Sequence, residues 1–157
     1  MRSLVLSVGH KPPSWIEQAC THYASRLPKD WQIQWRELRA EPRANHASAE
    51  QCKEREAQRI QASLQASPAL LVALDERGSK LTSSEFAAQC QRWHEQGDEP
   101  AFVIGSADGL HASIRDQAKL ILQLSAMTLP HGLVKVLIAE QLFRAWSILQ
   151  QHPYHRA

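Results

Sequence analysis

The sequence predicts an α/β fold with a largely parallel sheet. Short apolar runs alternate along the 157 residues with segments of helical spacing. Two of the runs, 69–74 and 101–104, are apolar at every position, as strands are when helices cover both faces of a parallel sheet. The length matches one domain, so residues 1–157 are expected to form a single unit.

The first elements are delimited by glycine and proline. The run Ser3–Val8 reads as a buried strand closed by Gly9. A helix is expected to follow, capped by Ser14 and ended by Pro28. Its predicted apolar face, at spacings of four, comprises Trp15, Ala19, Tyr23 and Leu27. A second strand is expected at 31–35, where strict alternation places two tryptophans and an isoleucine on one face.

Charges of both signs crowd the segment from 36 to 59. The stretch 41–46 within it is expected to be a mobile loop and is a candidate contact surface, the alternative being an ordinary solvated face. Ser48 and Gln51 have the spacing of a capping box for a helix that runs to about Leu64. The apolar stripe expected on that helix comprises Ala49, Cys52, Ile60 and Leu64.

The second half of the chain repeats the order of strand and helix. The strand 69–74 is expected to end at Asp75–Gly78, and helices are expected from Ser83 or Ser84 to His94 and from 112 to about 122. Parallel sheets bind ligands beyond the carboxyl ends of their strands. The strand ends at 74–75 and 105–106 are therefore the candidate ligand-binding positions.

Composition excludes several classes of protein. Eighteen Lys and Arg against sixteen Asp and Glu are too evenly balanced for nonspecific coating of nucleic acid, so any RNA contact is expected to be local. Three dispersed cysteines form no C-x-x-C pair and fit reduced thiols in a cytosol. The apolar run at 4–8 is too short for a signal peptide or a membrane span. A soluble, cytoplasmic protein is expected.

Two segments carry possible binding chemistry. Gly105–Gly109 joins a buried strand to a helix and allows close backbone approach to a ligand, although a tight turn without a ligand would look the same. It lacks both the dinucleotide fingerprint and the P-loop pattern. Leu124–Gly132 is small, hydroxylic and apolar, which suits an adenine ring and a sulfonium better than a polyphosphate; the alternative is an ordinary connection.

The C-terminal helix and tail are also unusual. Residues 133–149 are apolar on nearly every face, which predicts burial all round, either by the fold or by a partner subunit. Glu140 and Arg144 are spaced to pair. The tail 152–157 is either frayed or able to hold an unpaired base by aromatic and cationic stacking. Zinc binding by His152 and His155 is disfavoured because no cysteine or carboxylate nearby completes a site.

Three stretches carry a resemblance to a known family over essentially the whole chain. They are 124–131 (LSAMTLPH), 139–146 (AEQLFRAW) and 152–156 (HPYHR). With them the sequence closely resembles the RlmH family, the 23S ribosomal RNA pseudouridine N3-methyltransferases of the SPOUT superfamily. The resemblance implies a SPOUT-type fold whose C-terminal part threads a trefoil knot, an exception to the rule that chains avoid knots. It also implies a homodimer paired through the knot region, with no metal.

The resemblance implies which residues would meet S-adenosylmethionine and RNA. Cofactor contacts are expected from Leu74, Gly105, Ser125, Ala126, Met127, Thr128, Leu129 and Pro130. This chain has Ser106 where the family commonly has a second glycine, so a hydroxymethyl group must fit there. His155 is the expected base for the N3 proton, Arg156 the group that favours the developing anion, and Tyr154 a stacking or hydrogen-bonding partner of the target base.

The expected substrate is the assembled ribosome, with which the near-neutral net charge agrees. The competing interpretation is a noncatalytic ribosome-binding or assembly module with the same fold, for which the tail and the charged loop would suffice. A nucleotide-binding enzyme of another chemistry is disfavoured because the phosphate-binding motifs are missing.

Overall fold

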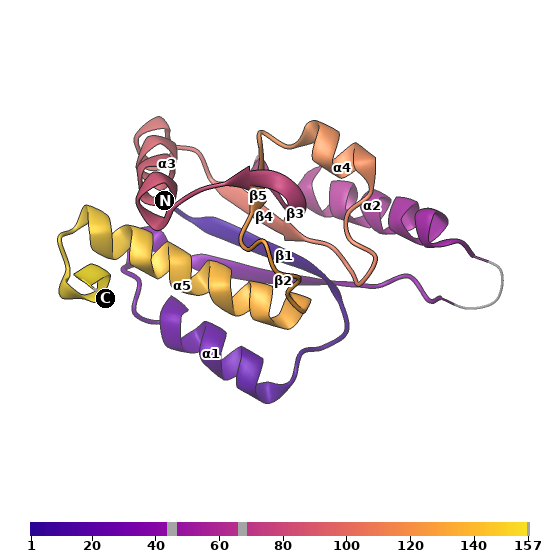
Figure 1. The fold of residues 1–157 in the computed structure, drawn as a ribbon, viewed down its shortest axis with the longest axis horizontal. Coiled ribbons are helices and arrows are strands. Elements are labelled where there is room, and N and C mark those ends of the chain that lie inside the picture. The colour runs from indigo at the N-terminus through magenta and orange to yellow at the C-terminus, as the bar shows by residue number, and fades with distance from the viewer. Residues whose placement is uncertain (44–46, 66–68, 157) are drawn as a thin grey trace.

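A five-stranded parallel sheet organises the protein (Figure 1). The computed structural model describes residues 1–43, 47–65 and 69–156, with the side chain of Arg156 left out. Every strand pairing is parallel, in the order β2-β1-β4-β3-β5. The strands are β1 (Ser3–Gly9), β2 (Ile33–Arg39), β3 (Leu70–Lys80), β4 (Pro100–Ile104) and β5 (Leu120–Gln123). The predicted α/β class is confirmed, and the trefoil knot stays a prediction.

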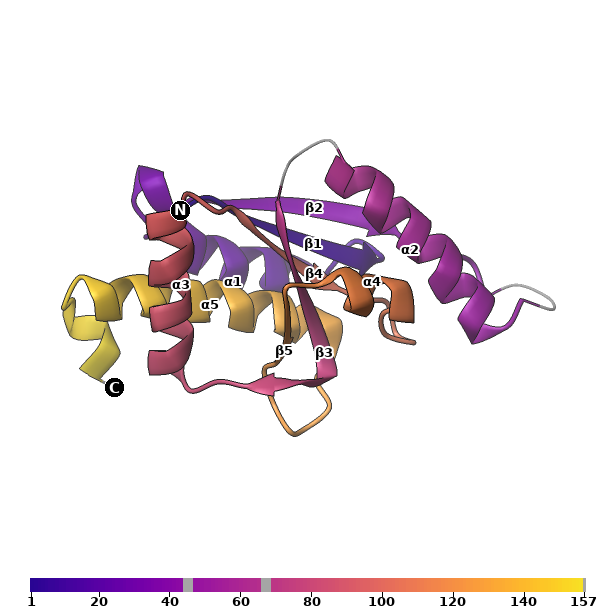
Figure 2. The ribbon, with the colours of Figure 1, turned by 90° about the horizontal axis from the view of Figure 1, so that it is seen from above.

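Helices cover both faces of the sheet, as the views in Figures 1 and 2 show. The helices are α1 (Ser14–Ala24), α2 (Ala49–Gln65), α3 (Ser83–Gln96), α4 (Ala112–Gln117) and α5 (His131–Leu149), with short 3₁₀ turns η1 (Lys29–Trp31) and η2 (Pro153–Arg156). One core packs α3 and α5 against the sheet through residues such as Phe102 and Leu142. A second core packs α2 and α4 against the other face through Ile60 and Ile114. Burial on both faces explains why the central strands are apolar throughout.

Helix α2 begins as the sequence predicts. The Gln51 amide donates to the Ser48 hydroxyl at 3.1 Å, and the Ser48 amide donates to the Gln51 side chain at 3.1 Å, which completes the capping box. Cys52 and Ile60 are buried along it, whereas Ala49 is exposed. The predicted loop before this helix is described only as far as Arg43, and its residues 44–46 lie outside the described part.

The first helix differs from the prediction in its cap and its buried face. Pro13 occupies the cap position, so Ser14 is the first helical residue and caps nothing. Ile16 and Cys20 are buried, whereas Trp15 is 54% exposed. A spacing of four fits both the predicted face with Trp15 and the neighbouring face with Ile16 and Cys20. Helix α5 packs on the face with Ile16. The helix ends at Ala24, before Pro28 is reached.

The strand after it also begins later than expected. Trp31 is buried in the 3₁₀ turn η1, and β2 starts at Ile33 and extends to Arg39. β2 is the edge strand beside β1, so its outward positions can be charged without loss of pairing.

The largest differences lie in β3 and β5. β3 continues through the polar residues 75–78 to Lys80, with a register shift between Leu74 and Ser79 against β5. Gly78 permits this because a Cβ there would lie 2.6 Å from the backbone carbon of Leu122. Helix α4 ends at Gln117, and residues 120–123, expected to finish that helix, form the strand β5.

Helix α5 is buried only in part by its own chain, so the burial of its remaining face by a partner subunit stays a prediction. Its core side includes Ile138, Leu142 and Phe143, all at most 1% exposed, but Leu133 and Leu137 are each 36% exposed. No described helix is long and apolar enough to cross a membrane.

Candidate functional site

A cavity of about 740 Å³ lies where the central strands end. Leu74 of β3 is in register with Ile104 of β4 and with Leu122 of β5, and all three side chains line the cavity. The wall is completed by the turn after β4, the segment between β5 and α5, and the first residues of α5. The cavity thus occupies the position beyond parallel strand ends where α/β sheets bind ligands.

Seven of the eight residues predicted to contact the cofactor line this cavity. They are Leu74, Gly105, Ser125, Met127, Thr128, Leu129 and Pro130. Ala126 is the exception and is not among the lining residues. The Met127 amide donates to the Ser125 hydroxyl at 2.9 Å, and the Met127 side chain is 79% exposed at the mouth of the cavity. Three separate stretches of the sequence therefore meet in one place.

The turn Gly105–Gly109 depends on its two glycines. Gly109 has a φ of +81°, in the left-handed region that L side chains rarely adopt. A Cβ on Gly105 would lie 2.6 Å from the carbonyl carbon of Gly109, so only glycine allows the chain to double back this tightly. The Gly109 amide donates to the Ser106 carbonyl at 2.8 Å and closes the turn.

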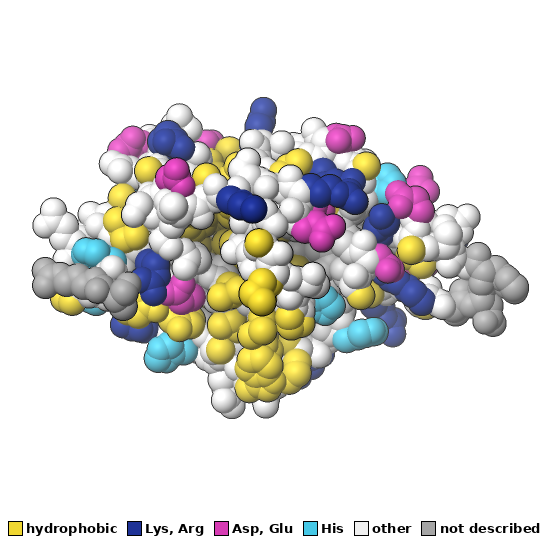
Figure 3. All heavy atoms as spheres, in the orientation of Figure 1, with side chains coloured by type: hydrophobic (Ala, Val, Ile, Leu, Met, Phe, Trp, Pro, Cys, Tyr) yellow, Lys and Arg dark blue, Asp and Glu magenta, His cyan; other side chains and the backbone are white. Residues whose placement is uncertain are grey.

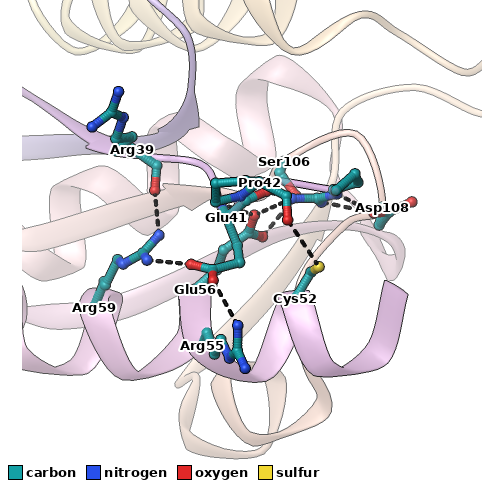
Figure 4. A network of polar contacts seen from close by, with 10 residues as sticks. Arg39, Glu41, Pro42, Cys52, Arg55, Glu56, Arg59, Ser106 and Asp108 are labelled. Atoms are coloured by element: carbon teal, nitrogen blue, oxygen red, sulfur yellow. Dashed lines mark hydrogen bonds and ion pairs between the residues drawn. The ribbon is translucent and has the colours of Figure 1, made fainter. Parts of the chain in front are cut away.

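Ser106, the departure from the family pattern, lines the cavity and is accommodated by polar contacts of its hydroxyl. Its hydroxyl donates to the carboxylate of Glu56 at 2.7 Å and accepts from Arg43 at 2.8 Å, as the close view in Figure 4 shows for the Glu56 side. Ser106 is 7% exposed. The extra hydroxymethyl group is therefore used in a network with α2 and the segment after β2.

Charged residues form the rim of the cavity, and sequence reasoning missed most of them. Lys53, Glu76, Arg77 and Arg115 come from α2, β3 and α4. Asp75, already marked by its position after Leu74, pairs with Arg115 at 3.6 Å and accepts from the Arg77 amide at 2.9 Å. No sequence signal connects Lys53 with Arg115, because only the fold brings them to one rim.

The C-terminal tail packs on the C-terminal half of α5 and does not line the cavity. The first turn of helix α5 lines the cavity, whereas the tail folds back from the last turn so that Tyr154 contacts Glu140 and Phe143. Figure 1 shows the chain turning back after α5, with the C-terminus beside the last turns of the helix. The structure therefore does not bring Tyr154 and His155 to the cavity of the same chain.

Tyr154 is held by aromatic and charged neighbours. Its ring lies edge-on to Phe143 with centroids 4.7 Å apart, and the Arg144 guanidinium lies 5.0 Å from the Tyr154 ring centroid. Its hydroxyl donates to Glu140 at 3.0 Å, and Glu140 also pairs with Arg144 at 2.7 Å, as the spacing predicts. The described part of the tail is thus docked.

Burial, and then the hydrogen bond to the Glu140 carboxylate, raise the pKa of Tyr154 to about 12. The phenol stays protonated near neutral pH and acts as a donor. Because the unfolded pKa is about 10, its contribution to stability is present below pH 10 and is lost as the pH rises towards 12.

A titration of tyrosinate absorbance is expected to place Tyr154 near pH 12. Chemical denaturation at several alkaline pH values should show a decline in unfolding free energy that Tyr154→Phe removes. Tyr154→Phe, which leaves Tyr23 as the one remaining tyrosine, identifies the part of the absorbance change that belongs to Tyr154. An ionisation of Tyr154 near its ordinary pKa would contradict the buried, carboxylate-bonded phenol.

His155 and Arg156 complete the predicted catalytic group. Nδ1 of His155 is buried and has no hydrogen-bond partner in the described part of the chain. The backbone of Arg156 lies in η2, and its side chain is outside the described part. Within the described ranges, no group of three His, Cys, Asp or Glu side chains is placed to hold a metal ion.

Comparison with known proteins agrees with the fold. The family model described as predicted SPOUT methyltransferase matches residues 1–155. The chain is similar in fold to a probable methyltransferase from Bordetella pertussis Tohama I (16% identity, TM-score 0.57, covering 92% of this chain and 95% of that one). It is also similar to a probable methylase family protein from Haemophilus influenzae Rd KW20 (14% identity, TM-score 0.57, covering 98% and 69%). The class of protein is therefore a SPOUT methyltransferase.

Full-length relatives give the closer assignment. The protein called ribosomal RNA large subunit methyltransferase H from Ralstonia pickettii 12J is 47% identical over 156 residues, with 99% of each chain covered. The protein of the same name from Burkholderia multivorans is 48% identical over 157 residues, with 100% of each covered. This chain belongs to the ribosomal RNA large subunit methyltransferase H family, which confirms the resemblance seen in its sequence.

Proposed function

We propose that this protein is a cytoplasmic, S-adenosylmethionine-dependent methyltransferase that methylates N3 of a pseudouridine in 23S ribosomal RNA, on the assembled ribosome and as a homodimer. The observation that carries the proposal is the single cavity in which Leu74, Gly105 and the segment 125–130 meet. The names of the full-length relatives support ribosomal RNA as the substrate.

The cavity has the size and chemistry for this cofactor. Its volume lies in the range of roughly 300–1,000 Å³ typical of small-molecule sites. Leu74, Ile104 and Leu122 offer an apolar surface for an adenine ring, while Ser125 and Thr128 supply hydroxyl groups. When bound, S-adenosylmethionine would supply a methyl group already activated by its sulfonium. The chain has to orient the reactants and accept the N3 proton.

The tail supplies the groups for the base. His155 accepts the N3 proton, and the buried, unpartnered Nδ1 sets this imidazole apart from one already committed to a hydrogen bond. Tyr154, protonated near neutral pH, stacks on or donates to the target base. Arg156 favours the anion that forms as the proton leaves. Because Tyr154 and His155 do not line the cavity of their own chain, a second copy provides these groups.

An apolar surface beside the cavity suits that second copy. Trp15 of α1 and Leu133 and Leu137 of α5 are large exposed hydrophobic residues. Figure 3 shows hydrophobic side chains gathered over the first turns of α1 and α5. Contiguous exposed apolar surface of this kind marks protein interfaces. A two-fold pair formed here buries the outer face of α5.

Ribosomal RNA from cells lacking this protein is expected to lose one methyl group on a pseudouridine, as measured by mass spectrometry. The wild-type gene should restore it fully, and Tyr154→Ala should restore less than about a hundredth, because base recognition is lost. Arg2→Ala, which removes an exposed ion pair with Glu99, serves as the control that restores it.

Two further measurements separate this function from its alternative. Unchanged methylation in the deleted cells would refute the assigned reaction. Calorimetry of the folded protein with S-adenosylmethionine should show binding; no heat of binding would favour a noncatalytic ribosome-binding module. Equal methylation of intact ribosomes and stripped RNA would refute dependence on assembly.

A further inference from the structure

A buried carboxylate connects helix α2 to the turn that forms one wall of the cavity. Glu56 is 3% exposed, and such a group is costly unless its oxygens are hydrogen-bonded. Three donors satisfy it: the Glu41 amide at 2.9 Å, Arg43 Nη1 at 2.7 Å and the Ser106 hydroxyl at 2.7 Å. These donors come from two segments, one after β2 and one after β4. Glu56 therefore ties both segments to α2 (Figure 4).

Arg43 spans the same turn from the other side. Its Nη2 donates to the Ser106 hydroxyl at 2.8 Å and to the Asp108 carboxylate at 2.7 Å, and its Nε donates to Asp108 at 2.9 Å. One planar guanidinium thus fixes residues 106 and 108 relative to each other and to Glu56. Hydrogen bonds to Glu56, the largest cause, raise the pKa of Arg43, so this cation stays charged.

The segment bearing Arg43 is itself anchored along α2. Glu41 pairs with Arg55 at 2.8 Å and also with Arg59. These outer pairs are more exposed than the contacts at Glu56 and are worth correspondingly less. The restraint on the turn therefore concentrates in the contacts among Arg43, Glu56 and Ser106.

The geometry points to Glu56, Arg43 and Ser106 as positioning residues that hold the Gly105–Gly109 turn in the shape that binds S-adenosylmethionine, an inference that rests on the proposed function. None of the three needs to touch the reacting atoms. Residues 105–109 all line the cavity, so a turn released from α2 would spend part of its time in shapes that do not complete the wall. The affinity for the cofactor then falls in proportion to the fraction of molecules in which the turn has the binding conformation.

Ser106→Ala and Glu56→Gln test the inference. Each removes a charge-assisted contact, and calorimetry is expected to show a Kd for S-adenosylmethionine raised about tenfold. The kcat at saturating cofactor should stay within about twofold of wild type while KM for the cofactor rises, because the turn is reordered once the cofactor is bound. Hydrogen exchange at the amides of 105–110 should be faster in the free variants.

Arg55→Ala is the matched control. Arg55 lies one residue before Glu56. Its substitution removes an exposed ion pair with Glu41, in the segment after β2, and leaves the contacts of Ser106 in place. Its Kd and its exchange rates at 105–110 are expected to equal those of wild type. An equal loss in Arg55→Ala would assign the effect to general loosening of the segment and overturn the inference.

The two levels of proposal fail in different ways. Wild-type affinity and unchanged exchange in Ser106→Ala would overturn the positioning role while leaving the methyltransferase intact. A wild-type protein that binds no S-adenosylmethionine would overturn the proposed function, and the inference with it; faster exchange in the variants would then show only that the network orders the turn. Thermal melts of each variant establish that the folded protein is being compared.

Discussion

Gly105→Ala is expected to weaken S-adenosylmethionine binding by about a hundredfold, which corresponds to roughly 2.7 kcal/mol. The added Cβ would lie 2.6 Å from the Gly109 carbonyl carbon and 2.7 Å from its oxygen. Both are backbone atoms closed into a hydrogen-bonded turn, so they cannot move aside as a flexible side chain would. The turn itself must shift, and with it the wall of the cavity. Calorimetry on the folded variant measures the loss.

Gly97→Ala provides the matched comparison. Gly97 follows α3 with a φ of +74°, and a Cβ there would meet nothing within 4 Å. Alanine at this position is strained by about 1 kcal/mol but lies away from the cavity lining. Its melting temperature should fall while its cofactor affinity stays unchanged. Wild-type affinity in Gly105→Ala would show that the turn is not part of the cofactor site.

The layered architecture could be predicted from the sequence because strands buried on both faces of a sheet are apolar at every position. Residues 69–74 and 101–104 are continuous apolar runs, and they form the central strands that the two helical layers cover. The capping box at Ser48 and Gln51 was legible for a similar reason, since both partners lie within one turn of chain. Local and repetitive signals survive in a single sequence.

The second half of β3 and all of β5 have no sequence pattern that identifies them as strands. Residues 75–80 are mostly solvent-exposed, so their polar composition resembles that of a loop although Ser79 and Lys80 pair with β5. β5 has four residues, too few for a period of two to be distinguished from the end of a helix. A glycine after an apolar run predicts the end of a strand, whereas Gly78 is the point where two backbones approach closely.

The part of the candidate site that lies in sequence motifs or at strand ends could be predicted from the sequence. The resemblance selected the segment 125–130, and strand ends selected Leu74 and Gly105; the fold then placed seven of those eight residues on one cavity. The polar partners of the site were not predictable. Glu56 and Ser106 are 50 residues apart, and nothing in either neighbourhood anticipates that one buried carboxylate would serve both segments.

A dimer that carries Gly105→Ala on one subunit and His155→Ala on the other is expected to retain about half the wild-type activity if the tail acts on its partner's cavity. At a cofactor concentration near the wild-type Kd, Gly105→Ala leaves one cavity almost empty, and His155→Ala on the other subunit disables one tail. Because the tail does not line the cavity of its own chain, the intact tail and the intact cavity lie on different chains and still meet across the two-fold axis. Two affinity tags allow this mixed dimer to be purified and assayed on ribosomes.

The reciprocal dimer decides the direction of the contact. In this dimer both substitutions are on one subunit and none is on the other. The substituted subunit has a damaged cavity, and the intact cavity of the other subunit meets a damaged tail. Activity should therefore fall below about a hundredth of wild type. A tail that folded back onto its own cavity would give the opposite pattern, with half activity here and none in the first dimer. The two preparations contain the same substitutions in the same amounts, so stability and expression cannot produce the difference between them.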